Sequence, residues 1–306
     1  MTNLKKVGLT ALAGSLAAIG YAQAGALDVT GTARMEFSTD STATTNTDAF
    51  AQNTSISFSG SGELDNGMNV SYFSLQAAGA NSSTQNVSVD MGDMGKISLS
   101  TNDMHGIGTI ADKVPNGGEQ PWDDIGTHGA PEQGIADPHA SQMLGYTVSL
   151  AAAKVTTALS YDQNSPSTSL AVSLPLMEGL EVGAGIATDQ DTATTEQDIQ
   201  TMYAKYTMGG ISVGYQTTDV EPTAANTDIE RNAYGISFAV NDNLSVGYGV
   251  SDTEFDALAL DEENKGIGIA YTSGGMKLGI INNQKDNAGG AAGDDETLEF
   301  QLTFAF

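Results

Sequence analysis

The amino-acid sequence predicts an all-β protein, a 16-stranded antiparallel transmembrane β-barrel. Three observations predict this fold. Segments of about ten residues with alternating apolar and polar side chains recur along the chain, and the connections between them are alternately short and long. No apolar stretch after residue 24 approaches the roughly 20 residues of a transmembrane helix. Only alternate residues of a barrel strand face lipid, so the mean hydropathy can remain slightly negative, at −0.17.

The first 24 residues are typical of a secretory signal peptide. Lys5 and Lys6 form a positive region, residues 7–19 are apolar and small, and Ala22-Gln23-Ala24 provides a cleavage site. An N-terminal membrane anchor is the alternative, but its apolar run would have to be longer. The predicted organisation is therefore a signal peptide over 1–24 and one barrel domain over 25–306.

The first predicted strand illustrates the alternation that defines all of them. Leu27, Val29 and Met35 fall on one face, and Arg34 and Glu36 fall on the other. The last segment, which ends at the C-terminus, alternates in the same way. The predicted strands are 26–38, 54–64, 68–77, 85–91, 95–101, 141–150, 153–162, 168–175, 180–188, 198–208, 211–219, 231–240, 243–253, 264–272, 276–284 and 296–306.

The connections follow a regular pattern of lengths. Asp65-Asn66-Gly67 is a tight hairpin signal, and every second connection after it is also short. Short turns on one rim and long loops on the other are typical of outer-membrane barrels, whose short turns face the periplasm. The predicted long connections are 39–53, 78–84, 102–140, 163–167, 189–197, 220–230, 254–263 and 285–295.

Proline placement is consistent with a closed wall. A proline inside such a wall removes a hydrogen bond that lipid cannot replace, and all 7 prolines avoid the predicted strand interiors. Pro175 is expected at a turn and Pro222 in a loop. A secreted β-sandwich or β-solenoid would also alternate, but a sandwich would need more strongly apolar strands and would not give strictly alternating connection lengths.

Composition narrows the function classes. The chain has no cysteine, which is compatible with export to an oxidising envelope. Removing residues 1–24 takes Lys5 and Lys6 from the 11 basic residues, so 9 basic and 38 acidic residues remain, a net charge of −29. This charge excludes nucleic acid as a partner.

Four short segments carry a resemblance that covers the whole mature chain. They are 29–35 (VTGTARM), 57–68 (SFSGSGELDNGM), 92–99 (GDMGKISL) and the C-terminal 302–306 (LTFAF). The chain resembles the Gram-negative general porins, particularly the alphaproteobacterial type. The resemblance implies a homotrimer in the outer membrane of a Gram-negative bacterium, surrounded by lipid and lipopolysaccharide. It also implies that the C-terminal segment is offered to the barrel-insertion machinery, and that the third long loop, 102–140, folds into the barrel as a constriction.

One departure from the family concerns the pore wall. General porins usually carry a cluster of arginines opposite the constriction loop, whereas Arg34 and Arg231 are the only arginines here. Lysines with lumen parity could substitute for that cluster. The candidate pore-wall residues are Arg34, Glu36, Lys96, Lys154 and Lys205, and Lys277 shares their parity.

The loop 102–140 is strongly acidic and has a single lysine, Lys113. A row of carboxylates in a narrow passage attracts cations and repels anions, although an exposed acidic loop is the alternative. Glu119, Asp123 and Asp124, around the only tryptophan, Trp122, are the first candidates. The remaining candidate constriction residues are Asp112, Glu132 and Asp137.

The sequence gives little support for metal binding or for catalysis. Calcium takes six to eight oxygen ligands and the acidic loop could supply some, but no EF-hand pattern is present. No cofactor is otherwise expected. There is no H-E-x-x-H or G-x-S-x-G motif, and the loop contains all three histidines, His105, His128 and His139, so a catalytic triad on the wall would lack its base.

The leading hypothesis is a passive diffusion channel for small hydrophilic solutes and ions that prefers cations. A substrate-specific channel and a non-conducting structural or adhesin barrel are the alternatives. An outer-membrane enzyme is not expected. Gly60 and Gly62 face outward and could either admit a neighbouring barrel or ease curvature of the wall.

Overall fold

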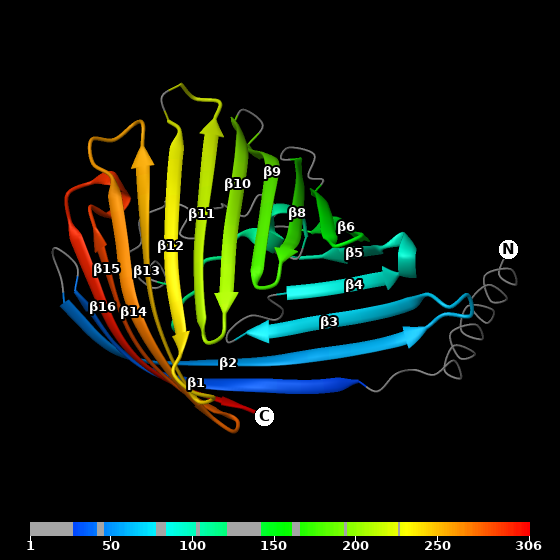
Figure 1. Cartoon of the computed structure of the whole chain (residues 1–306), viewed down its shortest axis with the longest axis horizontal. Coiled ribbons are helices and arrows are strands. Elements are labelled where there is room, and N and C mark those ends of the chain that lie inside the picture. Colours follow the sequence, from blue (N-terminus) through cyan, green and yellow to red (C-terminus); the bar gives the residue numbers. More distant parts are fainter. Residues whose placement is uncertain are drawn as a thin grey trace, which may run out of the picture.

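The computed structural model describes residues 27–41, 46–77, 84–101, 105–120, 142–160, 166–192, 195–225 and 227–306. Sixteen strands follow one another around a closed antiparallel barrel (Figure 1). This confirms the predicted fold class. The strands are β1 (Asp28–Ser41), β2 (Asn46–Glu63), β3 (Asn69–Ala77), β4 (Thr84–Asp90), β5 (Lys96–Ser100), β6 (Met143–Leu150), β7 (Ala153–Ser160), β8 (Ser167–Met177), β9 (Leu180–Thr192), β10 (Thr195–Met208), β11 (Ile211–Pro222), β12 (Ile229–Ala239), β13 (Leu244–Phe255), β14 (Glu262–Ser273), β15 (Met276–Asp286) and β16 (Asp294–Ala305).

The last strand closes the barrel on the first. β16 pairs with β1 from Thr32↔Ala305 onward, and the C-terminal residue continues the pairing. The Gly31 amide donates to the Phe306 carbonyl at 2.7 Å, and the Phe306 amide donates to the Gly31 carbonyl at 3.0 Å. A Cβ atom on residue 31 would lie 2.7 Å from Cε2 of Phe306, so glycine makes room for the terminal ring.

The short turns form where the sequence predicts them. In the turn between β2 and β3, the Met68 amide donates to Oδ1 of Asn66 at 3.1 Å, and Gly67 has a φ of 82°. In the turn between β12 and β13, Oδ1 of Asn241 accepts from the Leu244 amide at 3.0 Å. Side chains of this type stabilise turns by replacing strand hydrogen bonds. We call this rim the turn end and the opposite rim the loop end.

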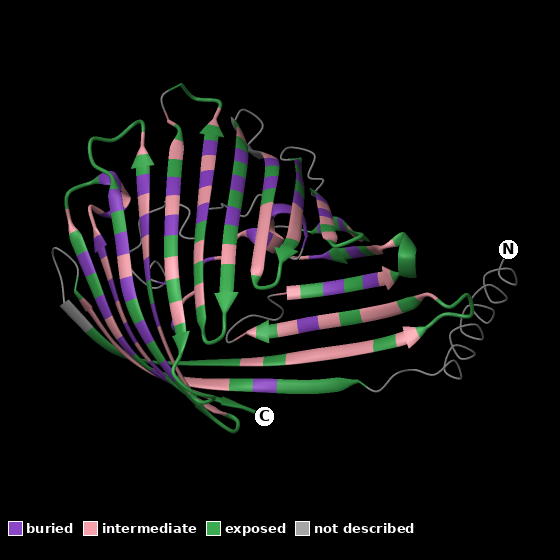
Figure 2. Ribbon diagram, viewed as in Figure 1, coloured by how far each residue is buried: buried purple, intermediate pink, exposed green. Residues whose placement is uncertain are grey.

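Buried and exposed residues alternate along many of the strands (Figure 2), and the side chains of the two faces of the wall differ accordingly. The outer face carries exposed apolar side chains, which a lipid environment would cover. Aromatic side chains gather on it near the turn end. The exposed apolar residues include Val29, Met35, Ile56, Val87, Leu99, Leu144, Leu170, Ile186, Met202, Val213, Ile236 and Ile267, and the aromatic ones include Tyr206, Phe238, Tyr271 and Phe304. The inner face instead carries serine, threonine, asparagine, glycine and most of the basic residues.

The wall is not equally tall all the way round. β3 has 9 residues, β4 has 7, β5 has 5, and β6 and β7 have 8 each. The strands from β8 to β16 have 11 to 14 residues. A tilted strand needs about 9–11 residues to cross the hydrocarbon layer. Within the described residues, the strands from β4 to β7 are shorter than this length.

Several predicted boundaries are wrong at the loop end. Residues 39–53 and 189–197 were expected to be long loops, but β1 and β2 pair as far as Ser41↔Asn46, and β9 and β10 enclose only residues 193 and 194. The extension of β2 contains the apolar run Ala49-Phe50-Ala51, which interrupts the alternation, and Phe50 packs against Phe37. Pro175 lies in β8 at an irregularity rather than at a turn, and Pro222 is the last residue of β11.

The predicted signal peptide lies outside the described residues. In the described part of the chain, no helix has the length and apolar character needed to cross a membrane. The helical elements described are three short 3-10 turns, η1 (Gly92–Met94), η2 (Gly106–Ile110) and η3 (Ala288–Gly290).

Candidate functional site

The third loop lies inside the barrel and follows its inner face. The described segment 105–120 begins beside β6 and runs across the strands to β16 (Figure 1). At its start, the His105 ring occupies the space that a side chain on Gly145 would need. The Gly106 amide then donates to Oγ1 of Thr156, and the Ile107 amide donates to Oγ of Ser169, both at 3.1 Å. Wall hydroxyls therefore replace the strand partners that the loop backbone lacks.

A small apolar core forms where η2 meets the inner face. Ile107 and Ile110 are 0% and 2% exposed, although they lie in a loop inside a barrel. Their partners come from β8, β9, β10 and β11, so the contact ties the loop to four strands. Those partners are Ala171, Ala187, Ile199, Tyr203 and Val220. Burying two isoleucines here stabilises the loop position by a few kcal/mol.

Gln216 of β11 holds the loop backbone from both sides. Its Nε2 donates to the Ile110 carbonyl at 2.8 Å, and its Oε1 accepts from the Lys113 amide at 3.0 Å. The side chain is 5% exposed. One buried amide thus satisfies a backbone acceptor and a backbone donor of the same loop.

Beyond Gln216, the loop lies on inner-face positions that carry no side chain. Side chains at Gly214 or Gly235 would overlap Pro115, and a side chain at Gly247 would overlap the backbone of Gly117. We call the inner-face glycines of β11 to β14 that contact the loop the glycine track. Its members, from β11 to β14, are Gly214, Gly235, Gly247 and Gly268.

The described segment ends against the last two strands. Nδ2 of Asn283 donates to the Gln120 carbonyl at 3.2 Å, and Nε2 of Gln301 donates to Oε2 of Glu119 at 2.6 Å. The same Gln301 nitrogen also donates to Oε2 of Glu299 at 2.8 Å. The loop therefore contacts every strand from β6 to β16 and forms a belt along the wall.

Of the candidate constriction residues, Asp112 and Glu119 are described and both lie on this belt. Asp112 is exposed within the lumen and accepts a hydrogen bond from Nε2 of Gln120. Enclosure by the barrel raises the pKa of the Asp112 carboxyl, and that hydrogen bond together with Lys113 and Lys205 acts in the opposite direction. Trp122, Asp123, Asp124, Glu132 and Asp137 lie outside the described residues, so their part in a constriction remains a prediction.

The candidate wall residues occupy the inner face at the expected parity. Nη2 of Arg34 is 3.1 Å from Oε2 of Glu36, so the guanidinium is neutralised by its neighbour on β1. Lys96, Lys154 and Lys205 lie on β5, β7 and β10, near the turn end.

A buried ion pair near the loop end has no signal in the sequence pattern. Lys285 and Glu262 are each 2% exposed, and their Nζ and Oε1 atoms are 3.8 Å apart. Oε1 of Glu262 accepts from Nδ2 of Asn264 at 2.9 Å, and its Oε2 accepts from the Gly289 amide at 2.7 Å. Gln216 and the glycine track were also missed, although the lumen parity of those glycines is a signal that the sequence contains.

Charge is divided unevenly between the two faces. After Lys6, every basic residue except Lys265 lies on the inner face or on the third loop. The outer face near the loop end is acidic instead. Six carboxylates surround a depression of about 250 Å³ there, namely Asp219, Glu221, Asp228, Glu230, Glu254 and Asp256.

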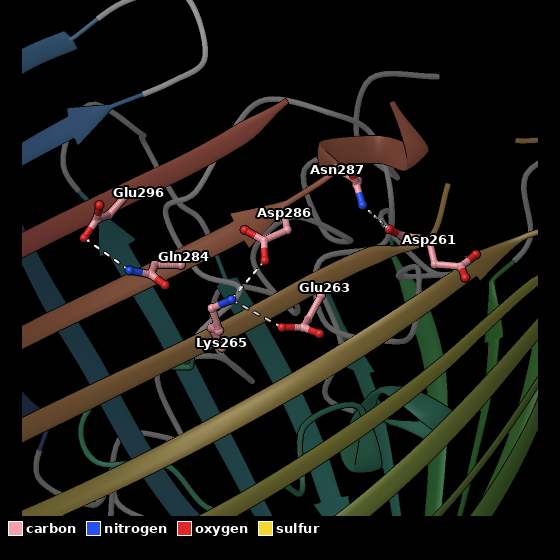
Figure 3. Close-up of polar contacts among 7 residues, drawn as sticks. All are labelled: Asp261, Glu263, Lys265, Gln284, Asp286, Asn287 and Glu296. Carbon is pink, nitrogen blue, oxygen red and sulfur yellow. Dashed lines mark hydrogen bonds and ion pairs between the residues drawn. The ribbon is translucent and has the colours of Figure 1, made fainter. Parts of the chain in front are cut away.

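Figure 3 shows the contacts of Lys265, the single lysine on the outer face. Its Nζ is 2.9 Å from Oδ2 of Asp286 and 3.4 Å from Oε1 of Glu263. The neighbouring Glu296 accepts from Nε2 of Gln284 at 3.4 Å. Across the described residues, no group of three histidine or acidic side chains could hold a metal ion. Most acids of the predicted calcium site lie outside that part of the chain.

Comparisons with known proteins agree with this architecture. A family model described as Gram-negative porin matches residues 8–272. No curated protein matches the chain.

Solved structures match over nearly the whole chain. An anion-selective porin from Comamonas acidovorans has a TM-score of 0.72 at 16% identity, covering 92% of this chain and 100% of its own. OmpT of Vibrio cholerae in a trimer form has a TM-score of 0.73 at 13% identity, with 93% and 100% covered. A triple mutant of the Rhodopseudomonas blastica porin has a TM-score of 0.66 at 14% identity, with 92% and 100% covered. At these identities the likeness is one of fold.

Proposed function

We propose, from the premise that this chain belongs to the Gram-negative porin family, that it is a passive diffusion channel for small hydrophilic solutes and ions and that it prefers cations. Family membership makes it an outer-membrane channel rather than an enzyme. Diffusion down a gradient needs no cofactor, and the proposal includes none.

The observation that carries the proposal is the path of the third loop. Its described segment lies along the inner face and is anchored on it from Thr156 to Gln301, so it narrows the lumen from the side. This arrangement favours an aqueous passage over a plugged barrel, because 16 strands enclose a lumen wide enough for water.

Cation preference is supported by the acids that this loop presents and by the acidic loop end. Asp112 is exposed in the lumen, and Glu119 lies farther along the same belt. The carboxylates around the loop end raise the local concentration of cations at the mouth. An ion that enters from the loop end meets these carboxylates before it meets the lysines nearer the turn end.

A planar-bilayer recording tests both parts of the proposal. We expect ohmic conductance steps, and in a KCl gradient a reversal potential with the sign of a cation-selective pore. Asp112→Asn should reduce that potential, whereas Asp242→Asn, in an exposed periplasmic turn, should leave it unchanged. Absence of conductance would reject the channel in favour of a structural barrel. Anion preference in the wild-type protein would reject the charge argument.

We further propose that the channel is a homotrimer in which the short sector of the wall faces neighbouring copies. In the described part of the chain, β4 to β7 are shorter than the length that crosses a hydrocarbon layer, which favours a neighbouring copy over lipid beside them. Gln76 and Gln85 face outward on this sector, where lipid would leave their amides without partners. OmpT of Vibrio cholerae is described in a trimer form. Lipid and lipopolysaccharide would then cover the taller sector, and the strand ending at Phe306 would meet the insertion machinery.

The absence of cysteine allows a clean test of the trimer. Light scattering of the purified protein should give three times the mass of one barrel. In membranes, Gln85→Cys should be shielded from a lipid-soluble maleimide, whereas Tyr234→Cys on the taller sector should react. A mass of one barrel together with equal labelling would reject the arrangement.

A further inference from the structure

The outward side chains of β11 to β15 form an apolar band that begins at the turn end. On β11, Ile211, Val213 and Tyr215 face outward and are 40%, 41% and 37% exposed. The next outward residue is Thr217, and Asp219 follows it. The apolar band therefore includes three outward positions of this strand. A strand that crosses a hydrocarbon layer needs about 9–11 residues, which present about five outward positions.

The neighbouring strands show the same limit. On β13, Val250 is the last outward apolar residue before Asp252, and on β15 Ile280 is the last before Asn282. The turn end and the first polar outward residue are six to eight residues apart on each strand. With a rise of about 3.3 Å per residue and a tilt of about 40°, the apolar band is roughly 15–20 Å tall, whereas outer-membrane barrels usually have a band of about 25 Å. The first polar outward residues are Thr217, Asn232, Asp252, Lys265 and Asn282.

Beyond this boundary, carboxylates face carboxylates across neighbouring strands. Asp219 of β11 is paired with Glu230 of β12. Asp252 of β13 is paired with Glu263 of β14, and Glu263 is paired with Asp286 of β15. Like charges directly opposite one another destabilise a sheet even in water, and hydrocarbon would add the cost of removing their hydration. The apolar band therefore cannot be extended toward the loop end by immersing these residues.

The one lysine at this level does not relax the limit. Nζ of Lys265 contacts both Asp286 and Glu263 (Figure 3), so the side chain is held by two carboxylates of the wall. In the register Lys265 is opposite Gln284, and Gln284 is opposite Glu296. Nε2 of Gln284 donates to Oε1 of Glu296 at 3.4 Å. The boundary is therefore a connected polar network and not a set of isolated long side chains that could reach out of a thicker layer.

The turn end limits the apolar band on its other side. Asn241 and Asp242 lie in the turn between β12 and β13, and Nδ2 of Asn243 donates to the Thr272 carbonyl at 2.7 Å. Phe238, the last outward aromatic residue of β12, is 46% exposed beside this rim. Phenylalanine next to polar turns is compatible with the edge of a hydrocarbon layer, and the turns themselves require water or head groups.

We infer that this wall fits a hydrocarbon layer of roughly 15–20 Å, and that the protein therefore takes lipids with short acyl chains as its neighbours in preference to lipids with long ones. Long chains beside β11 to β15 would surround Thr217 and Asn282 with hydrocarbon and bring it against the paired carboxylates. The strands themselves have 11 or 12 residues, so their polar ends would stand above the lipid. The inference concerns the lipid surroundings of the protein and does not depend on conduction.

Fluorescence quenching tests the preference at equilibrium. Trp122→Phe combined with Ile269→Trp leaves one tryptophan, on the outer face in the middle of the apolar band. This parent protein is reconstituted into vesicles that mix a brominated reference lipid with a phosphatidylcholine of about 10 to 20 carbons per chain, and the loss of quenching reports lipid exchange at the barrel. We expect chains of about 12 carbons to displace the reference lipid at least about threefold better than chains of about 18 carbons.

Lengthening the apolar band should change the preferred lipid. Thr217→Leu together with Asn282→Leu adds one outward apolar position to β11 and one to β15. In the parent background, this double variant should shift the preferred chain length upward by about two carbons. Thr223→Leu is the matched control, because residue 223 is exposed beyond the end of β11 and is separated from the apolar band by Asp219. It should leave the preferred chain length unchanged.

The outcomes separate this inference from the channel. Equal affinity for all chain lengths, or a preference of the parent for chains of about 18 carbons, would overturn the short-layer fit and leave the channel standing. An unchanged preference in the double variant would also overturn it, because the boundary residues would then not set the thickness. A protein that prefers short chains but does not conduct would overturn the channel alone. Heat-modified electrophoretic mobility shows whether each variant folds, and if the double variant does not, the parent measurement decides.

Discussion

Gly117 of the third loop and Gly247 of β13 lie so close together that neither position has room for a side chain. Gly247→Ala should therefore move the loop off the wall and into the lumen, lower the single-channel conductance, and destabilise the fold by about 1–3 kcal/mol through overpacking. Gly279→Ala is the control, because a Cβ there would meet its nearest neighbour, Cδ1 of Ile281, at 3.5 Å. Equal conductance in the two variants would show that the contact does not position the loop.

Gln216→Leu should loosen the loop without opening the barrel. The change leaves the Ile110 carbonyl and the Lys113 amide without their partner, at a cost of about 1–3 kcal/mol for each buried group. Hydrogen exchange measured by mass spectrometry should be at least about tenfold faster in the peptide covering 105–120. Gln284→Leu, on the outer face, should leave that exchange unchanged. Faster exchange throughout the strands would instead indicate global destabilisation.

Lowering the pH should detach the start of the third loop from the inner face. His105 is 3% exposed, and burial, together with the nearby charges of Lys96 and Lys154, lowers the pKa of its imidazole to about 4. The packed loop favours neutral His105, so its stabilisation is complete above pH 6.5 and is lost as the pH falls through about 4. The change is on the order of 3 kcal/mol.

Exchange near residue 105, or open-channel noise, should therefore rise between pH 6.5 and pH 4. His105→Gln cannot take up this proton and should show a much smaller pH dependence. An identical pH dependence in the variant would assign the effect to other groups.

The buried pair Lys285–Glu262 should behave as a coupled unit. Lys285→Met leaves the Glu262 carboxylate buried without a counter-charge and should cost about 3–5 kcal/mol. The double variant with Glu262→Gln should recover much of that loss. Midpoints of heat-induced unfolding for the two single variants and the double variant give the coupling. Additive losses would show that the two side chains act independently.

The wall was predictable from sequence because lipid on one face imposes alternation, and because residues such as Asn66 and Asn241 specify tight turns locally. The strand ends at the loop end were not predictable, since the pairing of β1 with β2 continues there through a segment without regular alternation. β2 begins at Asn46, eight residues before the predicted start at 54. Pro175 lies within a strand because an irregularity next to it absorbs the missing donor.

The sequence predicted which residue types form the site and in which region of the chain they lie, but not the contacts between them. Asp112, Lys154 and Lys205 were singled out from composition and parity. The partners of the loop were not, because Lys113 with Gln216 and Glu119 with Gln301 join residues far apart in the sequence. No local pattern records such a pairing, although glycines with lumen parity mark where a second backbone could lie.

The pairing of Thr32 with Ala305 has a consequence for biosynthesis. The β1 edge finds its partner only after β16 has been made, so no nascent chain that lacks β16 can form the closed wall. Until then both terminal strands expose unpaired hydrogen-bonding edges, which promote aggregation. Closure between such distant residues is also intrinsically slow. Closure of the wall must therefore wait until β16 has been translated, about 250 residues after β1.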